Sequence, residues 1–331
     1  MIMTGQNRVC QILGTEYPII QGAMALIAES SLAGAVSRGG GLGIIASGGA
    51  QGSWVVNEIK KIRAMTENPF GVNIMLLDPN VEEIIEIVCR EKVPVVTTGA
   101  GNPGKYIKRL KENGIAVLPV VANQTLAKRV ERAGADAVIA EGCEAGGHIG
   151  EITTMAMIPQ MADSLSIPVI AAGGIGDGRG IAAAYMLGAE GVQVGTRFLT
   201  SEECIVARNY KDAILKARDS STVATGRSTG HPVRVIKNKL ARQVLEMEKN
   251  NAEAEEINEV CTGSLRRAVF SGDMEMGSVM SGQIAGLVNK EQSAAEMISE
   301  MFKEAAEIYE DRHSIFRTGS SVSGDGQGTI R

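Results

Sequence analysis

The chain lacks the features that mark several large classes of protein. Aromatic residues make up only 3% of its 331 residues. No uninterrupted apolar run reaches the ~18 residues that a membrane span requires. The formal net charge of −5 argues against general nucleic-acid binding. The amino terminus has no basic segment followed by an apolar stretch and a small-residue cleavage site, so secretion is not expected. These absences favour a cytoplasmic protein without a nucleic-acid or membrane partner.

Cysteine and histidine are scarce as well. Only three histidines are present, and the five cysteines are Cys10, Cys89, Cys143, Cys204 and Cys261. The cysteines are odd in number, widely scattered and form no C-x-x-C pair. That pattern is typical of reduced thiols in a cytoplasm, and it predicts no zinc or other metal site.

Glycine and aliphatic residues are abundant, with 40 glycines and a hydrophobic content of 44%. Eight short apolar runs, separated by helical patterns, cover residues 17–21, 43–46, 71–75, 93–97, 116–120, 137–140, 168–171 and 191–194. One helical pattern carries Val55, Ile59 and Ile62 on a single face. Continuously apolar strands that alternate with helices indicate a parallel sheet covered on both sides. Eight such strands predict an α/β fold of the (β/α)8 TIM-barrel type, with two sheets of four strands as the alternative.

The alternation stops after the eighth strand. Residues 200–275 read as helices and loops without clear strands, and we expect them to form an inserted cap or substrate domain. Residues 1–199 and 276–313 are expected to form the barrel. A returning helix from Ser293 to Tyr309 opens with the capping box Ser293-x-x-Glu296. The tail at 314–331 is rich in Gly, Ser and Thr, which predicts disorder.

The loop after the sixth strand contains His148 among glycines. A loop at the carboxyl end of a strand is where α/β folds place their chemistry, and histidine transfers protons near neutral pH. An incidental histidine in a surface turn is the alternative. Glu141 and Glu144 lie in the same loop, where a carboxylate would raise the pKa of the imidazole unless it is solvated or caps a helix. Cys143 is expected to be a small loop residue rather than a nucleophile.

Two glycine loops predict a phosphate site. Gly173 and Gly174 follow the seventh strand, and Gly195 and Thr196 follow the eighth. In a barrel these loops lie side by side, with unpaired backbone N–H groups aimed at an anion. Across the barrel mouth, the small residues of 22–24 leave room for a flat ring. Asn73 offers a donor and an acceptor there, unless it is a buried, satisfied asparagine. Together these features suit a phosphorylated planar cofactor such as FMN.

Six collinear motifs then resemble one family. They are Gln21-Gly-x-Met24, Pro69-Phe-Gly-Val-Asn73, Glu141-x3-Ala145-Gly-Gly-His148, Ala172-Gly-Gly-Ile175, Gln193-Val-Gly-Thr-Arg-Phe198 and Gly282-Gln283. Over residues 5–310 the chain resembles the nitronate monooxygenase (2-nitropropane dioxygenase) superfamily. Residues 97–103 and 278–288 look like its FabK-type branch, the FMN-dependent enoyl-ACP reductase II.

The resemblance implies roles for particular residues. His148 takes the position of the catalytic histidine. FMN contacts are implied for Gly22, Ala23, Met24, Asn73, Glu141, Gly173, Gly174, Gln193, Gly195, Thr196 and Gln283. The same resemblance implies a homodimer, NADH or NADPH as the hydride donor, and a monovalent cation as a further ligand. His231 and Arg234 are implied for substrate or NAD(P)H contact. Nitronate monooxygenase, which shares fold, flavin and histidine, is the rival activity. A barrel isomerase or synthase that binds only a phosphate is a further alternative.

The segment 205–242 carries nine basic residues against Asp212 and Asp219, a charge of +7 in an acidic chain. A concentrated positive charge indicates an anionic partner. Under the resemblance, that partner is the acidic acyl carrier protein, with the 2′-phosphate of NADPH as a rival. A solvated helix face, balanced by the acidic run at 246–259, is the remaining explanation.

Overall fold

The structure, a computed structural model, describes residues 7–312. Eight parallel strands form one sheet in the order β1-β9-β8-β6-β5-β4-β3-β2. A parallel bridge between Ile20 and Leu42 joins β1 to β2, so the two ends of the sheet meet. The strands are β1 Ile19–Gln21, β2 Gly43–Ala46, β3 Phe70–Met75, β4 Val95–Gly99, β5 Ala116–Val121, β6 Val138–Glu141, β8 Val169–Ala172 and β9 Gly191–Val194. The predicted (β/α)8 barrel is confirmed, and each strand overlaps one of the eight apolar runs.

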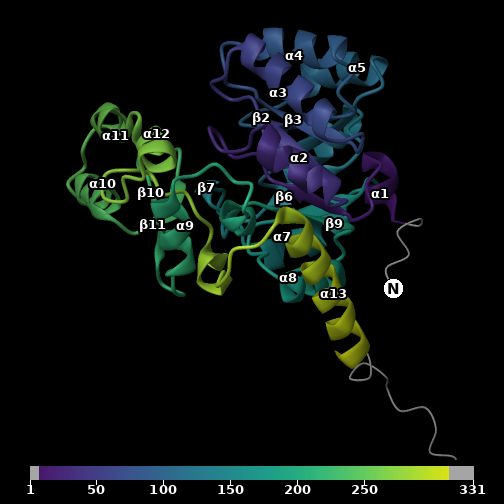
Figure 1. Cartoon of the computed structure of the whole chain (residues 1–331). Coiled ribbons are helices and arrows are strands. Elements are labelled where there is room, and N and C mark those ends of the chain that lie inside the picture. The colour runs from purple at the N-terminus through teal and green to yellow at the C-terminus, as the bar shows by residue number, and fades with distance from the viewer. Residues whose placement is uncertain (1–6, 313–331) are drawn as a thin grey trace, which may run out of the picture.

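Helices surround this barrel (Figure 1). They are α1 Arg8–Leu13, α2 Ser30–Arg38, α3 Gly52–Met65, α4 Val81–Arg90, α5 Gly104–Glu112, α6 Gln124–Arg132, α7 Thr154–Ala162, α8 Gly178–Met186 and α13 Ala294–Arg312. The predicted helical face of Val55, Ile59 and Ile62 is buried on α3. Because β-strand side chains alternate between two faces, one set packs under these helices and the other fills the barrel interior. Val9 and Leu13 of α1 join the interior cluster.

The returning helix α13 begins as its capping box predicts. The backbone N–H of Ser293 donates to Glu296 Oε2 at 3.1 Å, and the backbone N–H of Glu296 donates to Ser293 Oγ at 3.3 Å. Met297 and Met301 are buried where α13 packs against α8 and α2. The predicted disordered tail at 314–331 lies outside the described residues.

A smaller lobe, residues 222–271, stands beside the barrel (Figure 1). It contains the hairpin β10 Thr222–Thr225 and β11 Val233–Ile236, followed by α10 Lys239–Lys249, α11 Ala254–Cys261, α12 Ser264–Arg266 and a π-helical turn at Arg267–Ser271. The 3₁₀ turn Thr196–Thr200 and α9 Arg208–Leu215 lead into it, and the 3₁₀ turn Gln283–Leu287 follows it.

The expectation that residues 200–275 contain no clear strands is wrong. β10 and β11 pair antiparallel over four residues each, with Val233 opposite Thr225 and Val235 opposite Val223. Such strands alternate between polar and apolar residues, and Arg234 interrupts the apolar sequence of β11. A search for continuous apolar runs therefore passes over them.

Candidate active site

The loops that leave the carboxyl ends of the barrel strands enclose a cavity of about 860 Å³, here called the barrel-mouth cavity. This volume is typical of a small-molecule or cofactor site. Most residues predicted to contact FMN line it: Gly22, Ala23, Met24, Asn73, Glu141, Gly173, Gly174, Gln193, Gly195 and Thr196. His148 and His231 line it too. The topology therefore brings residues from six strands to one opening.

The glycine loops after β8 and β9 have the geometry of an anion cradle. Gly173 and Gly174 both adopt left-handed backbone, with φ of 85° and 75°. Within residues 7–312, the backbone N–H groups of Gly174 and Ile175 have no hydrogen-bond partner. Backbone donors left unpaired beside a cavity require water or a ligand. Donors of this kind fit the phosphate of FMN.

The His148 loop is fixed against the segment after Met280 by close backbone contact. A Cβ atom at Gly146 would lie 2.6 Å from the backbone nitrogen of Gly282, so only glycine fits there. The N–H of Gly282 donates to Thr196 Oγ1 at 2.9 Å, and the N–H of Gln283 donates to the carbonyl of Glu144 at 2.9 Å. Gln283 thus ties two loops through its backbone, while its side chain is exposed and lines neither this cavity nor the one described below.

Asn73, on β3, is held in place from the neighbouring strand. Its Nδ2 donates to Thr97 Oγ1 at 3.0 Å, which fixes the side-chain amide at the cavity wall. Its backbone carbonyl accepts a hydrogen bond from Ser47 Oγ at 2.6 Å. The remaining amide oxygen and N–H are available to hydrogen-bond a heteroaromatic ring.

The two carboxylates of the His148 loop have different environments. Glu141, at the end of β6, faces the cavity deep in the barrel mouth, and burial raises the pKa of its carboxyl group to about 7. Its partial exposure is toward this recessed cavity. Glu144 instead caps α7: its oxygens accept hydrogen bonds from the backbone N–H and hydroxyl of Thr154 at 3.0 Å. The alternative that one of these carboxylates is a helix cap is confirmed.

Arg234 anchors the same loop from the smaller lobe. Its Nη2 and Nε donate to the carbonyl of Cys143 at 3.0 and 3.2 Å. The guanidinium is buried and lines neither cavity, so the structure does not bring it to a substrate. Burial raises the pKa of the Cys143 thiol, which keeps it protonated near neutral pH.

His148 lies on a two-residue strand, β7 Gly147–His148, which extends the hairpin sheet. His148 pairs with Val233 and Gly147 pairs with Arg234. The backbone of His148 is therefore held by the smaller lobe as well as by the barrel loop. Although part of the ring opens on the cavity, burial lowers its pKa, and the nearby His231 lowers it further. Glu144 points to Thr154 and does not raise this pKa, in keeping with the helix-cap alternative.

The basic segment divides into paired and unpaired charges. Arg208 and Lys211 form ion pairs with Glu291, at 2.7 and 3.0 Å, and Arg227 pairs with Glu151 at 2.6 Å. The others, apart from Arg234, are exposed and form no ion pair within residues 7–312: Lys216, Arg218, Lys237, Lys239 and Arg242. Part of the positive charge is thus neutralised by ion pairs within the protein, and part is presented to solvent without a partner in the described residues.

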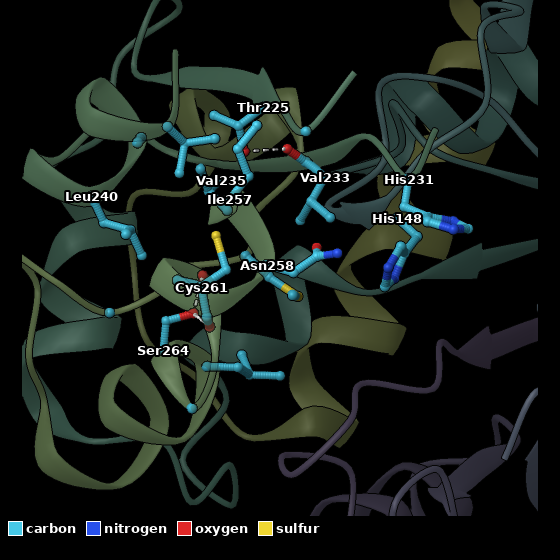
Figure 2. A pocket seen from close by; sticks show the side chains of 18 of the residues that line it. His148, Thr225, His231, Val233, Val235, Leu240, Ile257, Asn258, Cys261 and Ser264 are labelled. Atoms are coloured by element: carbon cyan, nitrogen blue, oxygen red, sulfur yellow. Dashed lines mark hydrogen bonds between the residues drawn. The ribbon is translucent and has the colours of Figure 1, made fainter. Parts of the chain in front are cut away.

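Several lining residues were not predicted from the sequence. The loop Gly99–Gly101 borders the barrel-mouth cavity, with Ala100 at a strained φ of 56°. The glycines after β4 were a signal for this loop, since strand-end glycines mark close approach. Leu265 had no comparable signal, whereas Met280 lies in the motif at 278–288. Both residues also line a second cavity in the smaller lobe. His148 and His231 border this cavity as well (Figure 2).

Among the described residues, no group of three or more His, Cys, Asp or Glu side chains is arranged to hold a metal ion. All five cysteines are free thiols. None of the helices within residues 7–312 is both long and apolar enough to cross a membrane.

The fold and site define the protein as a (β/α)8 barrel with an anion cradle and a histidine at the barrel mouth. The chain matches the family described as nitronate monooxygenase over residues 6–87 and 79–304. It belongs to this family and is an oxidoreductase. The family predicted from the six motifs is confirmed.

The chain is similar to three known proteins. FabK from Thermotoga maritima is 50% identical, with a TM-score of 0.91 over 94% of this chain and 99% of that one. A nitroalkane oxidase from Streptomyces ansochromogenes is 28% identical, with a TM-score of 0.82 over 92% of this chain and 99% of that one. A probable nitronate monooxygenase of Staphylococcus aureus (strain MSSA476) is 35% identical over 328 residues, which cover 85% of this chain and 92% of that protein.

Proposed function

We propose that the protein is an FMN-dependent enoyl-ACP reductase that reduces the trans-2 double bond of enoyl thioesters with NADH or NADPH. One observation carries the proposal. The chain is 50% identical to FabK from Thermotoga maritima over 94% of its length, against 28% for the nitroalkane oxidase and 35% for the probable nitronate monooxygenase. The motifs at 97–103 and 278–288 support the same branch.

FMN is the cofactor that the barrel-mouth cavity fits. The unpaired N–H groups of Gly174 and Ile175 would hold its phosphate, and the small residues of 22–24 leave room for its ring. Bound FMN would supply the hydride transfer from NAD(P)H to C3 of the enoyl group. The protein then has to orient the substrate and stabilise charge.

His148 is the residue we assign to the chemistry of the substrate. Addition of hydride at C3 places negative charge on the thioester oxygen, as an enolate. The lowered pKa of His148 leaves its imidazole neutral near pH 7, with one ring N–H to donate to that oxygen. The pairing of β7 with β11 fixes the backbone from which this hydrogen bond is made.

We propose that the protein is a cytoplasmic homodimer. Its partner would be an acidic acyl carrier protein that carries the enoyl thioester. The exposed bases without an ion pair in the described part of the chain, among them Lys237 and Lys239, would attract it. Such surface charges mainly raise the association rate and lose their effect in salt.

Nitronate monooxygenase is the second candidate, and the state of His148 is compatible with it as well. A neutral imidazole at the cavity is suited to abstract a proton from the carbon of a nitroalkane. The names of the nitronate and nitroalkane relatives point the same way.

An anaerobic experiment separates the two activities. FMN-loaded protein is reduced with NADH or NADPH, and crotonyl thioester is then added without oxygen. Prompt return of the oxidised flavin spectrum supports enoyl reduction. Reoxidation that requires oxygen, together with consumption of nitroalkane, would support the oxygenase instead.

A further inference from the structure

The smaller lobe contains a second cavity of about 410 Å³, here called the lobe pocket (Figure 2). It lies between the β10–β11 hairpin and helices α10 to α12. It shares His148, His231, Leu265 and Met280 with the barrel-mouth cavity. The two cavities are therefore neighbours that share a wall at the histidine that we assign to the chemistry.

The floor of the lobe pocket is aliphatic. Leu240, Val244 and Ile257 line it, with exposures of only 3%, 2% and 2%, and they form a small core of their own. Val235 and Ala241 add apolar wall from the hairpin and from α10. A surface of this kind gains free energy by removing hydrocarbon from water.

The polar side chains of the pocket are largely used within the protein. Asn238 Nδ2 donates to the carbonyl of Gly277 at 2.8 Å, and its Oδ1 accepts from the backbone N–H of Ala241 at 2.9 Å. The hydroxyl of Thr229 donates to the carbonyl of Gly226 at 2.8 Å. Ser264 and Ser278 bond each other at 2.7 Å. Arg266, whose guanidinium lies 5.4 Å from the centroid of the Phe270 ring, and Asn258 also line the pocket.

The barrel contributes one strained residue to this pocket. Leu26, in the loop after β1, has φ of 65°, a conformation that a leucine adopts only under constraint. It lines the lobe pocket, while Ala23 and Met24 of the same loop line the barrel-mouth cavity. A single loop therefore shapes the wall of both cavities.

We propose that the lobe pocket binds the aliphatic chain of the acyl substrate and sets the range of chain lengths that the enzyme accepts. The inference rests on the proposed enoyl reduction, in which the double bond lies at His148 and the carbons beyond it need an apolar path. The shared wall at His148 and the aliphatic floor favour a hydrocarbon chain, and the nucleotide end of NAD(P)H is the competing ligand that the second test below checks.

The first test changes the volume of the pocket. Ala241→Leu fills it from α10, Val244→Ala enlarges it, and Ala156→Leu on the exposed surface of α7 is the matched control. The measured quantity is the ratio of kcat/KM for trans-2-decenoyl thioester to that for crotonyl thioester. Ala241→Leu should lower this ratio at least about tenfold, as expected when roughly two methylene groups can no longer be buried. Val244→Ala should raise kcat/KM for thioesters longer than decenoyl, relative to kcat/KM for crotonyl thioester. Ala156→Leu should leave the decenoyl-to-crotonyl ratio at the wild-type value.

The second test reports binding without turnover. Cys261 lines the pocket and is half-buried, so its alkylation by N-ethylmaleimide is measured by peptide mass spectrometry on the FMN-loaded protein. Cys89, half-buried on α4 outside the barrel, is the internal reference. Saturated decanoyl-N-acetylcysteamine should slow the alkylation of Cys261 several-fold, and the butyryl analogue and NADPH should not.

The outcomes distinguish this inference from the proposed function. Equal loss of decenoyl and crotonyl turnover in Ala241→Leu, or protection of Cys261 by NADPH but not by the decanoyl probe, would overturn the chain-binding pocket. Absence of crotonyl turnover in wild-type protein, with decanoyl protection of Cys261 retained, would reject the reductase but support the pocket.

Discussion

Replacing Glu141 with glutamine should stabilise the protein, and the gain should grow with pH. The pKa of this carboxyl is raised from 4.5 to about 7 by burial, which means that the folded protein resists its ionisation. The unfolded chain ionises it at the ordinary pKa. Between these two pH values the unfolded state binds fewer protons than the folded state, so the stability of the wild type falls as pH rises. Glutamine mimics the neutral acid and removes this loss.

The size of the effect follows from the two pKa values. A tenfold change in a proton-binding constant is worth about 1.4 kcal/mol. The rise from 4.5 to about 7 then corresponds to about 3 kcal/mol, fully expressed above pH 7 and absent below pH 4.5. Water in the open cavity screens part of it, so about 2 kcal/mol is the expected gain. This raises Tm by roughly 5 °C.

The assay is denaturant or thermal unfolding of cofactor-free protein across this pH range. Glu67→Gln, at an exposed position between α3 and β3, controls for the loss of one negative charge. The difference between Glu141→Gln and wild type should be near zero in acid and largest in mild alkali. A constant difference at every pH would refute the assignment of Glu141 as a buried, reluctantly ionised acid.

Three further predictions concern the loop, the partner surface and the chemistry. His148→Ala should retain FMN absorbance but lower kcat/KM for crotonyl thioester by about 10²- to 10³-fold, and His148→Gln, which keeps an N–H donor, should recover part of it; equal activity of the two variants would argue against hydrogen bonding as the role. Lys237→Glu combined with Lys239→Glu should raise KM for the carrier-protein substrate at low salt, with the difference shrinking as salt is added; an equal rise for a small crotonyl thioester would contradict docking. Gly146→Ala should cost about 1–3 kcal/mol of unfolding free energy, because its Cβ meets the backbone of Gly282 at 2.6 Å. Gly99→Ala, which meets nothing within 4 Å, should be nearly neutral in the same denaturation experiment.

The barrel was predictable because each parallel strand is buried on both faces. Runs such as those at β6 and β8 are apolar on consecutive residues, with a helical pattern after each, and eight such repeats favour a closed barrel over two sheets of four strands. The ends of those strands then gave the barrel-mouth residues without any side-chain geometry. Gly173, Gly195 and Asn73 reach one cavity because parallel strands all end on the same side of the barrel.

Contacts between distant segments could not be predicted from the sequence in the same way. Arg234 and Gln283 carry polar side chains that suit a ligand, yet one bonds the Cys143 carbonyl and the other faces solvent. The pairing of β7 with β11 depends on a two-residue strand that has no periodicity to detect. The lobe pocket combines side chains from a barrel loop, a hairpin and three helices, and each of these residues alone resembles ordinary core.

Under the proposed function, we expect the choice between reductase and oxygenase to be made outside the barrel. Both activities use a barrel with a phosphate cradle and a neutral histidine, so the residues at the strand ends serve either one. A nitroalkane is small enough for the barrel-mouth cavity alone, whereas an enoyl chain needs a continuation. If the lobe pocket holds the chain, that continuation starts beside His148, because β7 joins the backbone of the histidine to the sheet that forms a wall of the pocket. The same hairpin would then set both the position of the histidine backbone and the length of the bound chain. Substitutions in the lobe should consequently alter substrate range before they alter cofactor binding.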